Sequence, residues 1–232
     1  MGISLNDKIK SVVDDYNDIA IEYCDEFGEN DNYNKYIDKW LNLVGSGKIL
    51  DVGCGCGKNC NYINSFDGFI STGIDFSDNM LEEARKRNPS VEVFKMDMTE
   101  LSFDDNSFDG ILSNCSMIHT PIELVPQTLL GFKRVLKENG RLLLILLEGN
   151  GEEMVEEPYR AGQNVFVYTK FYSLEEIIGI LHNSGFSIND IEIRKTESEN
   201  ELGSGELIVY AQNKEISLEE KKNEVKRLIR VK

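Results

Sequence analysis

A short apolar run that leads directly into three closely spaced glycines restricts the fold of this chain more than any other feature. In the segment ILDVGCGCG, residues Ile49 to Val52 stand immediately before Gly53, Gly55 and Gly57. A run this short is typical of a buried strand rather than of a helix, and glycine reaches backbone conformations with positive φ that other residues avoid. The segment therefore predicts a strand that ends in a tight turn, where the backbone can approach a ligand closely.

Strands and helices alternate along the remainder of the sequence. The apolar periodicity predicts helices over 9–23, 33–44, from 58, and over 79–87 and 126–137, and strands over 49–52, 69–75, 91–96, 110–113 and 141–147. A helix then begins after Ser173, with Glu176 in the position of a capping box, and strands over 186–194 and 206–212 and a charged helix from 217 follow. This alternation predicts parallel βαβ units in a doubly wound α/β sheet, with the ligand beyond the carboxyl ends of the strands.

The composition limits the classes of partner. Forty-one acidic residues against 25 basic residues give a formal net charge of −16, which disfavours binding to nucleic acid or to an anionic membrane. No apolar run reaches the roughly 20 residues that cross a bilayer, and the N-terminus lacks the apolar core of a signal peptide. The five cysteines are an odd number and do not suggest a disulfide framework. We therefore expect a cytoplasmic protein with reduced thiols.

The glycine segment also carries three cysteines, so two interpretations of it compete. Cys54, Cys56 and Cys60 follow the spacing C-x-C-x-x-x-C, whereas thiolate metal sites usually combine paired C-x-x-C units separated by a longer stretch. Neither Cys24 nor Cys115 supplies a second pair. We therefore expect no metal and attribute the function of the segment to its glycines.

The glycine spacing predicts a nucleoside ligand rather than a dinucleotide. The dinucleotide fingerprint G-x-G-x-x-G would place its third glycine at position 58, where the sequence has lysine. The turn is instead G-x-G-x-G, and no Gly-Lys-Ser or Gly-Lys-Thr follows at the distance of a phosphate loop. Asp75 ends the next predicted strand, where an acidic side chain can accept the hydroxyl hydrogens of a ribose.

Several segments, in order, resemble those of the class I S-adenosylmethionine-dependent methyltransferases, and in particular the small-molecule methyltransferases among them. ILDVGCGCG resembles the first motif of that family, and GIDFSDNMLEEAR, FKMDMTELSFDDNSFDGILSNCSMIHTP and FKRVLKENGRLLLIL continue the match over residues 48–147. The segment FYSLEEIIGILHNSGF extends the resemblance into the C-terminal region of the sequence. The resemblance implies S-adenosyl-L-methionine as cofactor. It also implies a Rossmann-like, mostly parallel sheet of seven strands with an N-terminal helical lid and a C-terminal antiparallel strand pair.

The resemblance also implies roles for individual residues. Asp51 and the glycine turn would surround the methionine and ribose of the cofactor. Asp75 would bind the ribose, and Asp97 the amino group of the adenine. The full set of implied cofactor-binding residues is Asp51, Gly53, Cys54, Gly55, Gly57, Asp75, Phe76, Met80, Asp97, Met98 and Asn114. Packing in the core explains the three apolar members, Phe76, Met80 and Met98, equally well.

Two side chains are candidates for the chemical step. Methyl transfer from a sulfonium depends chiefly on alignment and needs a base only where the nucleophile must lose a proton. His119 stands where related small-molecule methyltransferases frequently have a histidine facing the substrate, although a structural role in the turn before Pro121 explains it equally well. Tyr16 belongs to a segment that resembles the N-terminal helix covering the cofactor. Core packing accounts better for Tyr23 of the same helix.

The sequence thus predicts a methyltransferase that acts on an oxygen or nitrogen of a small molecule, as a monomer or homodimer. Two alternatives stay open. One is a noncatalytic module that binds the cofactor or its product. The other is an aminopropyl-type transferase, although the neutral segment SNCSMIH lacks the acidic motif that we would expect there.

We expect a single domain. Residues 148–172 show no clear period and predict loops with a short strand near 165–168, and loops of this length often serve as lids. The predicted parts are an N-terminal helical cap over 1–45, a cofactor-binding core over 46–147, a substrate-side loop, helix and last strands over 148–213, and a C-terminal helix over 214–232.

Overall fold

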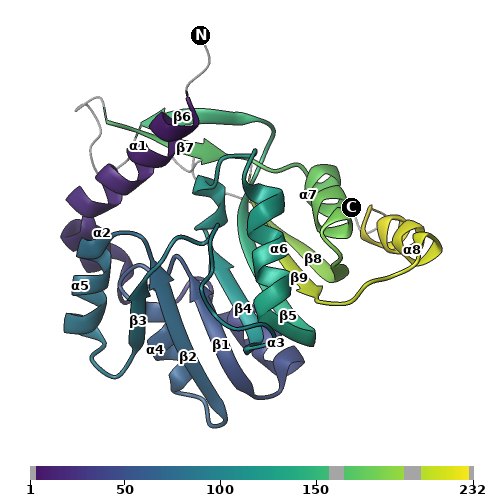
Figure 1. The fold of residues 1–232 in the computed structure, drawn as a ribbon, viewed down its shortest axis with the longest axis horizontal. Coiled ribbons are helices and arrows are strands. Elements are labelled where there is room, and N and C mark those ends of the chain that lie inside the picture. The colour runs from purple at the N-terminus through teal and green to yellow at the C-terminus, as the bar shows by residue number, and fades with distance from the viewer. Residues whose placement is uncertain (1–3, 157–164, 196–204, 230–232) are drawn as a thin grey trace.

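A seven-stranded sheet in the order β3-β2-β1-β4-β5-β9-β8 forms the centre of the fold (Figure 1). The structure is a computed structural model that describes residues 4–156, 165–195 and 205–229. The strands from β3 to β5 are parallel to their neighbours, and β9 is antiparallel to both β5 and β8. The predicted fold class is therefore confirmed. The strands are β1 (Gly47–Val52), β2 (Phe69–Asp75), β3 (Glu92–Lys95), β4 (Phe108–Asn114), β5 (Leu136–Glu148), β8 (Ser187–Lys195) and β9 (Gly205–Gln212).

Helices flank the sheet at most of the predicted places. Ser77 and Ser173 cap two of them, since each side-chain oxygen accepts a hydrogen bond from the backbone N–H three residues on. The turn-rich segment 196–204 between the last two strands lies outside the described residues. The helices are α1 (Leu5–Asp18), α2 (Ala20–Phe27), α3 (Asn34–Val44), α4 (Lys58–Asn64), α5 (Asp78–Arg87), the 3-10 turn η1 (Met117–His119), α6 (Val125–Val135), α7 (Leu174–Asn183) and α8 (Leu218–Ile229).

The prediction of one continuous N-terminal helix over 9–23 is wrong, because two helices, α1 and α2, occupy that range. The break falls at Ile19, whose backbone leaves the helical region at φ −99° and ψ 7°. Ile19 and Ala20 are both 2% exposed, and α2 packs against α5. The bend thus lets one amphipathic segment bury apolar side chains against two different surfaces.

The central strands are buried on both faces, as parallel sheets usually are. Successive side chains of a strand point to opposite faces. Ile49 packs in the cluster that contains Trp40 of α3, and Leu50 packs in the cluster that contains Phe132 of α6. This two-sided core fixes the positions of the strand ends, where the glycine turn begins.

A small second sheet lies over one end of the main sheet. It pairs β6 (Glu152–Glu156) with β7 (Phe166–Lys170) in antiparallel fashion, and α1 lies beside β7 (Figure 1). The sequence predicted a strand near 165–168 but missed β6, because Glu-Glu-Met-Val-Glu offers two apolar residues between three carboxylates. Among the described residues, no helix combines the length and the apolar character needed to cross a membrane.

Candidate functional site

The glycine turn after β1 fits only with glycine at its first position. Gly53 has φ +69°, and a Cβ atom there would lie 2.3 Å from the Cβ of Ser116. The backbone N–H groups of Gly53 and Cys54 both donate to the carbonyl of Ile74, at 2.8 and 2.9 Å. The turn is therefore held between the end of β2 and the segment that follows β4.

Asp75, at the end of β2, is fixed by the backbone on both carboxylate oxygens. Oδ2 accepts a hydrogen bond from the N–H of Gly55 at 2.9 Å, and Oδ1 accepts one from the N–H of Ser77 at 2.9 Å. Burial raises the pKa of the Asp75 carboxyl, and these backbone donors oppose that shift. The carboxylate is thus oriented before any ligand arrives, and each oxygen keeps a further lone pair.

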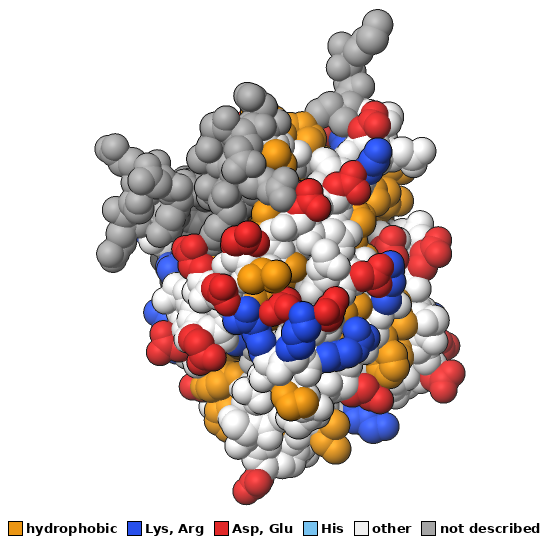
Figure 2. Space-filling model, turned by 90° about the vertical axis from the view of Figure 1, so that its left-hand side faces the viewer, with side chains coloured by type: hydrophobic (Ala, Val, Ile, Leu, Met, Phe, Trp, Pro, Cys, Tyr) orange, Lys and Arg blue, Asp and Glu red, His pale blue; other side chains and the backbone are white. Residues whose placement is uncertain are grey.

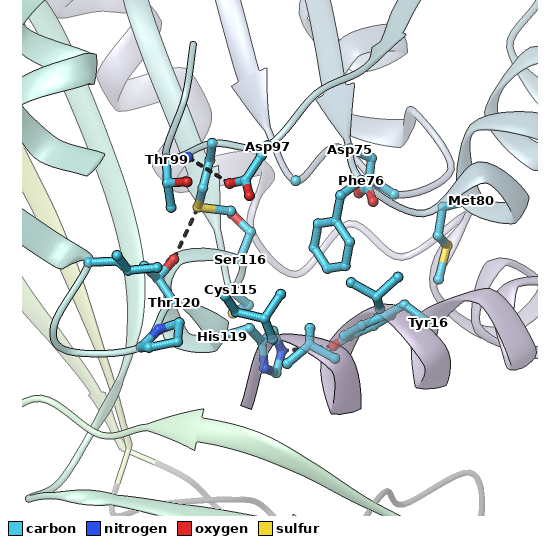
Figure 3. Close-up of a pocket in the computed structure, with 18 of the residues that line it drawn as sticks. Tyr16, Asp75, Phe76, Met80, Asp97, Thr99, Cys115, Ser116, His119 and Thr120 are labelled. Atoms are coloured by element: carbon cyan, nitrogen blue, oxygen red, sulfur yellow. Dashed lines mark hydrogen bonds between the residues drawn. The ribbon is translucent and has the colours of Figure 1, made fainter. Parts of the chain in front are cut away.

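A cavity of about 130 Å³ opens beside Asp75 and gathers most of the predicted residues. Figure 3 shows Asp75, Phe76 and Asp97 along one side of it and Tyr16 and His119 facing them. The predicted residues that line this cavity are Tyr16, Gly53, Gly55, Asp75, Phe76, Met80, Asp97, Met98, Asn114 and His119. Residues that are far apart in the sequence therefore share one site.

A larger cavity of about 660 Å³ adjoins the first. The two share lining residues, among them Tyr16, Asn114 and His119. Aliphatic side chains of Ile118 and Val167 line part of the larger cavity. The two cavities thus lie next to each other, and Tyr16 and His119 line both.

The hydrogen bonds of His119 define its tautomer. Nδ1 lies 2.9 Å from the carbonyl oxygen of Tyr168, which can only accept, so Nδ1 carries the proton. Nε2 therefore carries a lone pair, which accepts a hydrogen bond from the hydroxyl of Tyr16 at 2.9 Å. The two side chains form a pair in which the lone pair of a neutral imidazole is directed toward α1.

The environment of His119 keeps its imidazole neutral. Burial lowers the pKa of His119 to about 4, and the hydrogen bond to the Tyr168 carbonyl only partly opposes this shift. No charged partner contributes. At neutral pH the ring is therefore able to accept a proton but is a weak base.

The far end of the first cavity is lined by groups suited to a heterocycle. Asp97 Oδ1 accepts from the N–H of Thr99 at 2.8 Å, which orients the carboxyl group. Met98 lines the same end and accepts from the hydroxyl of Thr120 through its sulfur at 3.2 Å. Phe76 and Met80 line the cavity and also pack in apolar clusters. These two side chains therefore both pack in the core and line the cavity.

Asn114, at the end of β4, presents an unused acceptor. Its Oδ1 is buried and has no hydrogen-bond partner among the described residues. Cys115 follows with φ 52°, a conformation that is uncommon outside glycine and concentrates at functional sites. A ligand with a proton donor near the glycine turn would satisfy the Asn114 oxygen.

Three predicted residues lie elsewhere. Cys54 lines only the larger cavity, and Asp51 and Gly57 line neither cavity. Asp51 is fully buried beneath the turn, where its Oδ2 accepts from the thiol of Cys60 at 3.5 Å. Burial raises the pKa of Asp51 to about 7, and the charge of Asp75 adds to this shift. The structure therefore places Asp51 behind the site, as a support of the turn.

Asp51→Asn is expected to stabilise the ligand-free protein above neutral pH. In the unfolded chain the pKa of this carboxyl is about 3.9, whereas in the folded protein its pKa is about 7. Stability is therefore lost as pH rises between these values. We expect the free energy of unfolding of the variant to exceed that of the wild type by about 1 to 3 kcal/mol at pH 8 and by less at pH 5. Urea unfolding at the two pH values measures this, and an equal gap at both would contradict the assignment.

The cysteines of the glycine segment do not converge on a common point. Cys54 and Cys60 pack in one apolar cluster with side chains of α5 and β3, and Cys60 also bonds to Asp51, whereas Cys56 packs toward α2. Within the ranges that the structure describes, no three His, Cys, Asp or Glu side chains are placed to hold a metal ion.

Sequence reasoning missed the partners that orient these groups. The Tyr168 carbonyl fixes the His119 tautomer, and a backbone carbonyl leaves no signal in the sequence. Thr99, two residues after Asp97, fits the pattern of an Asx turn, which did offer such a signal. Tyr23 lines both cavities, whereas we had assigned it to the core.

Comparison with known proteins finds similarity to methyltransferases. A family model described as a methyltransferase domain matches residues 49–140. The demethylmenaquinone methyltransferase of Staphylococcus aureus is 34% identical over 124 residues, which cover 51% of each chain. Phosphoethanolamine N-methyltransferase 1 of Zea mays is 29% identical over 169 residues, 69% of this chain and 32% of the maize protein. The chain spans about half the length of several curated relatives that it matches.

Solved structures agree on the fold. The 1,6-didemethyltoxoflavin-N1-methyltransferase of Burkholderia thailandensis aligns with a TM-score of 0.74 at 16% identity, over 93% of this chain and 92% of its own. The magnesium protoporphyrin IX methyltransferase of Synechocystis aligns with a TM-score of 0.65 at 18% identity, over 91% and 99%. At such identities the likeness establishes the shared architecture.

Proposed function

We propose that the chain is a class I S-adenosylmethionine-dependent methyltransferase that transfers the methyl group of S-adenosyl-L-methionine to an oxygen or nitrogen of a small molecule. The observation that carries this proposal is the pair of Tyr16 and His119, which lines both cavities. A nucleophile that must lose a proton requires a base such as a neutral imidazole, whose Nε2 lone pair can accept that proton.

The residues of the smaller cavity fit the cofactor. Both oxygens of Asp75 keep lone pairs for the ribose hydroxyls, and Asp97 presents its carboxyl to an adenine amino group. Phe76, Met80 and Met98 would pack against the adenine. The unpaired Oδ1 of Asn114 would accept from the ammonium of the methionine portion. Asp51, Gly57 and Cys54 would act indirectly by shaping the turn.

The chain's own residues would direct the proton of the acceptor. As the new bond to carbon forms, an attacking hydroxyl or amine becomes much more acidic, so even a weak base can accept its proton. Nε2 of His119 accepts it directly or through the hydroxyl of Tyr16, which then passes its own proton to Nε2. The Tyr168 carbonyl stabilises the imidazolium, since Nδ1–H already donates to it at 2.9 Å.

A small acceptor is supported by the shape of the site and by the relatives. The larger cavity is lined by side chains from α2, β6 and β7, which limits the size of an acceptor. The names of similar proteins contain demethylmenaquinone, phosphoethanolamine and 1,6-didemethyltoxoflavin. We propose that residues 1–232 form one domain, which acts as a monomer or homodimer.

Methyl transfer can be measured with S-adenosylmethionine that carries a tritiated methyl group. We expect label to pass to at least one member of a panel of phenols, amines and carboxylic acids. A folded protein that binds the cofactor but labels no acceptor would instead be a binding module. Release of methylthioadenosine from decarboxylated S-adenosylmethionine would indicate aminopropyl transfer.

A further inference from the structure

Two cysteines meet where the N-terminal cap contacts the glycine turn. Cys24 lies on α2 and Cys56 lies in the turn, and the two are 1% and 4% exposed. They pack in one apolar cluster with Ala20 and Met80, and each thiol shifts the pKa of the other. The Cys24 thiol donates a hydrogen bond to the sulfur of Met80 at 3.9 Å. A cysteine of the glycine segment thus has a thiol partner 32 residues away in the sequence.

The backbones of both cysteines are held by consecutive residues. Nη1 of Arg87 donates to the carbonyl of Cys24 at 3.1 Å, and Nδ2 of Asn88 donates to the carbonyl of Cys56 at 2.9 Å. Arg87 is itself paired with Asp25 at 2.6 Å. Figure 2 shows basic side chains among the acidic ones on the face that carries α2 and α5. The end of α5 therefore fixes the two cysteines side by side.

The electrostatic surroundings make the two thiols unequal. The neighbouring Cys24 thiol, together with the charges of Arg87 and Lys58, lowers the pKa of Cys56 to about 7. The proximity of Cys56 and burial raise the pKa of Cys24. Burial raises the pKa of Cys115 to about 12. Near neutral pH, Cys56 therefore carries the largest share of the reactive thiolate among these three.

We propose that Cys24 and Cys56 form a redox-active dithiol, which a low-molecular-weight disulfide such as oxidised glutathione converts to a disulfide that ties α2 to the glycine turn. Cys56, which lines the larger cavity, is the attacking thiol, and Cys24, which lies behind it in the cluster, is the resolving thiol. Redox-sensing cysteines commonly pair a nucleophile with a resolving thiol in this way.

The reaction is a balanced exchange in two steps. The Cys56 thiolate attacks one sulfur of the reagent, forms a mixed disulfide and releases one glutathione thiolate. Cys24 then loses its proton to that leaving thiolate and attacks the sulfur of Cys56, which releases a second glutathione thiolate. Overall the protein loses two protons and two electrons, and one molecule of oxidised glutathione becomes two of the reduced form.

A bound cofactor is expected to block the first step. The reagent reaches Cys56 through the larger cavity, where the neighbouring turn residues Gly53 and Gly55 also contact the smaller one. A nucleoside seated on this turn closes the approach. This part of the proposal rests on the proposed function, whereas the formation of the disulfide does not.

Oxidised glutathione and intact mass spectrometry test the dithiol directly. The wild-type protein is expected to lose two hydrogens, and digestion should yield one peptide pair joined between Cys24 and Cys56. Cys24→Ser should stop at a stable glutathione adduct on Cys56, and Cys56→Ser should form neither product. Cys115→Ser is the matched control, since Cys115 lines the same cavity, and it should form the disulfide as the wild type does.

Three results would overturn the proposal. The first is a disulfide between another pair of cysteines, and the second is preferential reaction of Cys115 with oxidised glutathione. The third is a native protein that stays reduced under conditions that oxidise the urea-unfolded chain. Saturation with S-adenosylhomocysteine at about ten times its Kd should slow oxidation about tenfold, because only the free protein reacts. If S-adenosylhomocysteine binds and the rate of oxidation does not change, the reagent does not reach Cys56 through the larger cavity. If S-adenosylhomocysteine does not bind, the mass-spectrometric test of the disulfide still decides whether the dithiol exists.

Discussion

His119→Ala is expected to lower kcat by about 10²- to 10⁴-fold, the contribution typical of a positioned acid or base. The affinity for S-adenosylhomocysteine should stay unchanged, because the imidazole is directed to Tyr16 and the Tyr168 carbonyl. Single-turnover kinetics and calorimetry measure the two quantities. His182→Ala is the control, since His182 lies on α7 and contacts Glu224 at 2.9 Å. Equal turnover of His119→Ala and the wild type would make His119 a structural residue only.

The dependence of turnover on pH should carry the signature of His119. Only the neutral imidazole accepts a proton, and its pKa is lowered to about 4. Activity should therefore persist as the pH falls from 7 to 5 and disappear as it falls through about 4, provided that the protein remains folded. An acid limb near 6.5 that is lost in His119→Ala would show that the imidazole is not desolvated as the structure indicates.

Tyr16→Phe separates a direct base from a relay. The variant removes the hydroxyl that donates to Nε2 at 2.9 Å but keeps the ring. If the proton passes through Tyr16, kcat should fall nearly as far as in His119→Ala. If Nε2 accepts it directly, the loss should be small, because the lone pair then becomes free.

Asp75→Ala is expected to weaken the binding of S-adenosylmethionine by about 1 to 3 kcal/mol, because the ribose hydroxyls would lose their acceptors. The substitution also removes the acceptor for the N–H groups of Gly55 and Ser77. Asp75→Asn keeps an acceptor oxygen and should have a smaller effect. Calorimetry measures both variants, with thermal unfolding to verify that each is folded. Unchanged affinity in Asp75→Ala would show that the nucleoside does not lie against β2.

Much of the fold follows from apolar periodicity and turn residues. The helices near 79–87 and 126–137 were predicted because apolar residues recur in them at helical spacing, and most of those residues are buried. The break at Ile19 could not be predicted, since the apolar stripe continues across it and only the packing of α2 on α5 shows the bend. β6 escaped notice because its stability comes from pairing with β7 and from contacts outside its own sequence.

The candidate site was predictable where a residue type carries the information. The glycines and Asp75 mark the turn and the strand end that approach each other. The role of His119 depends on two partners, Tyr16 and the Tyr168 carbonyl, which lie 103 and 49 residues away in the sequence. The pairing of Cys24 with Cys56 depends in the same way on the tertiary fold. Such contacts follow from packing and not from local patterns.

The central claim is that the cavity between the glycine turn and α1 holds S-adenosylmethionine in contact with Asp75 and beside His119. Calorimetric titration of the purified protein with S-adenosylhomocysteine tests it most directly. The account predicts one equivalent bound per chain, with affinity that falls in Asp75→Ala and is retained in His119→Ala. Absence of binding to the folded wild-type protein, or equal affinity in Asp75→Ala, would contradict it.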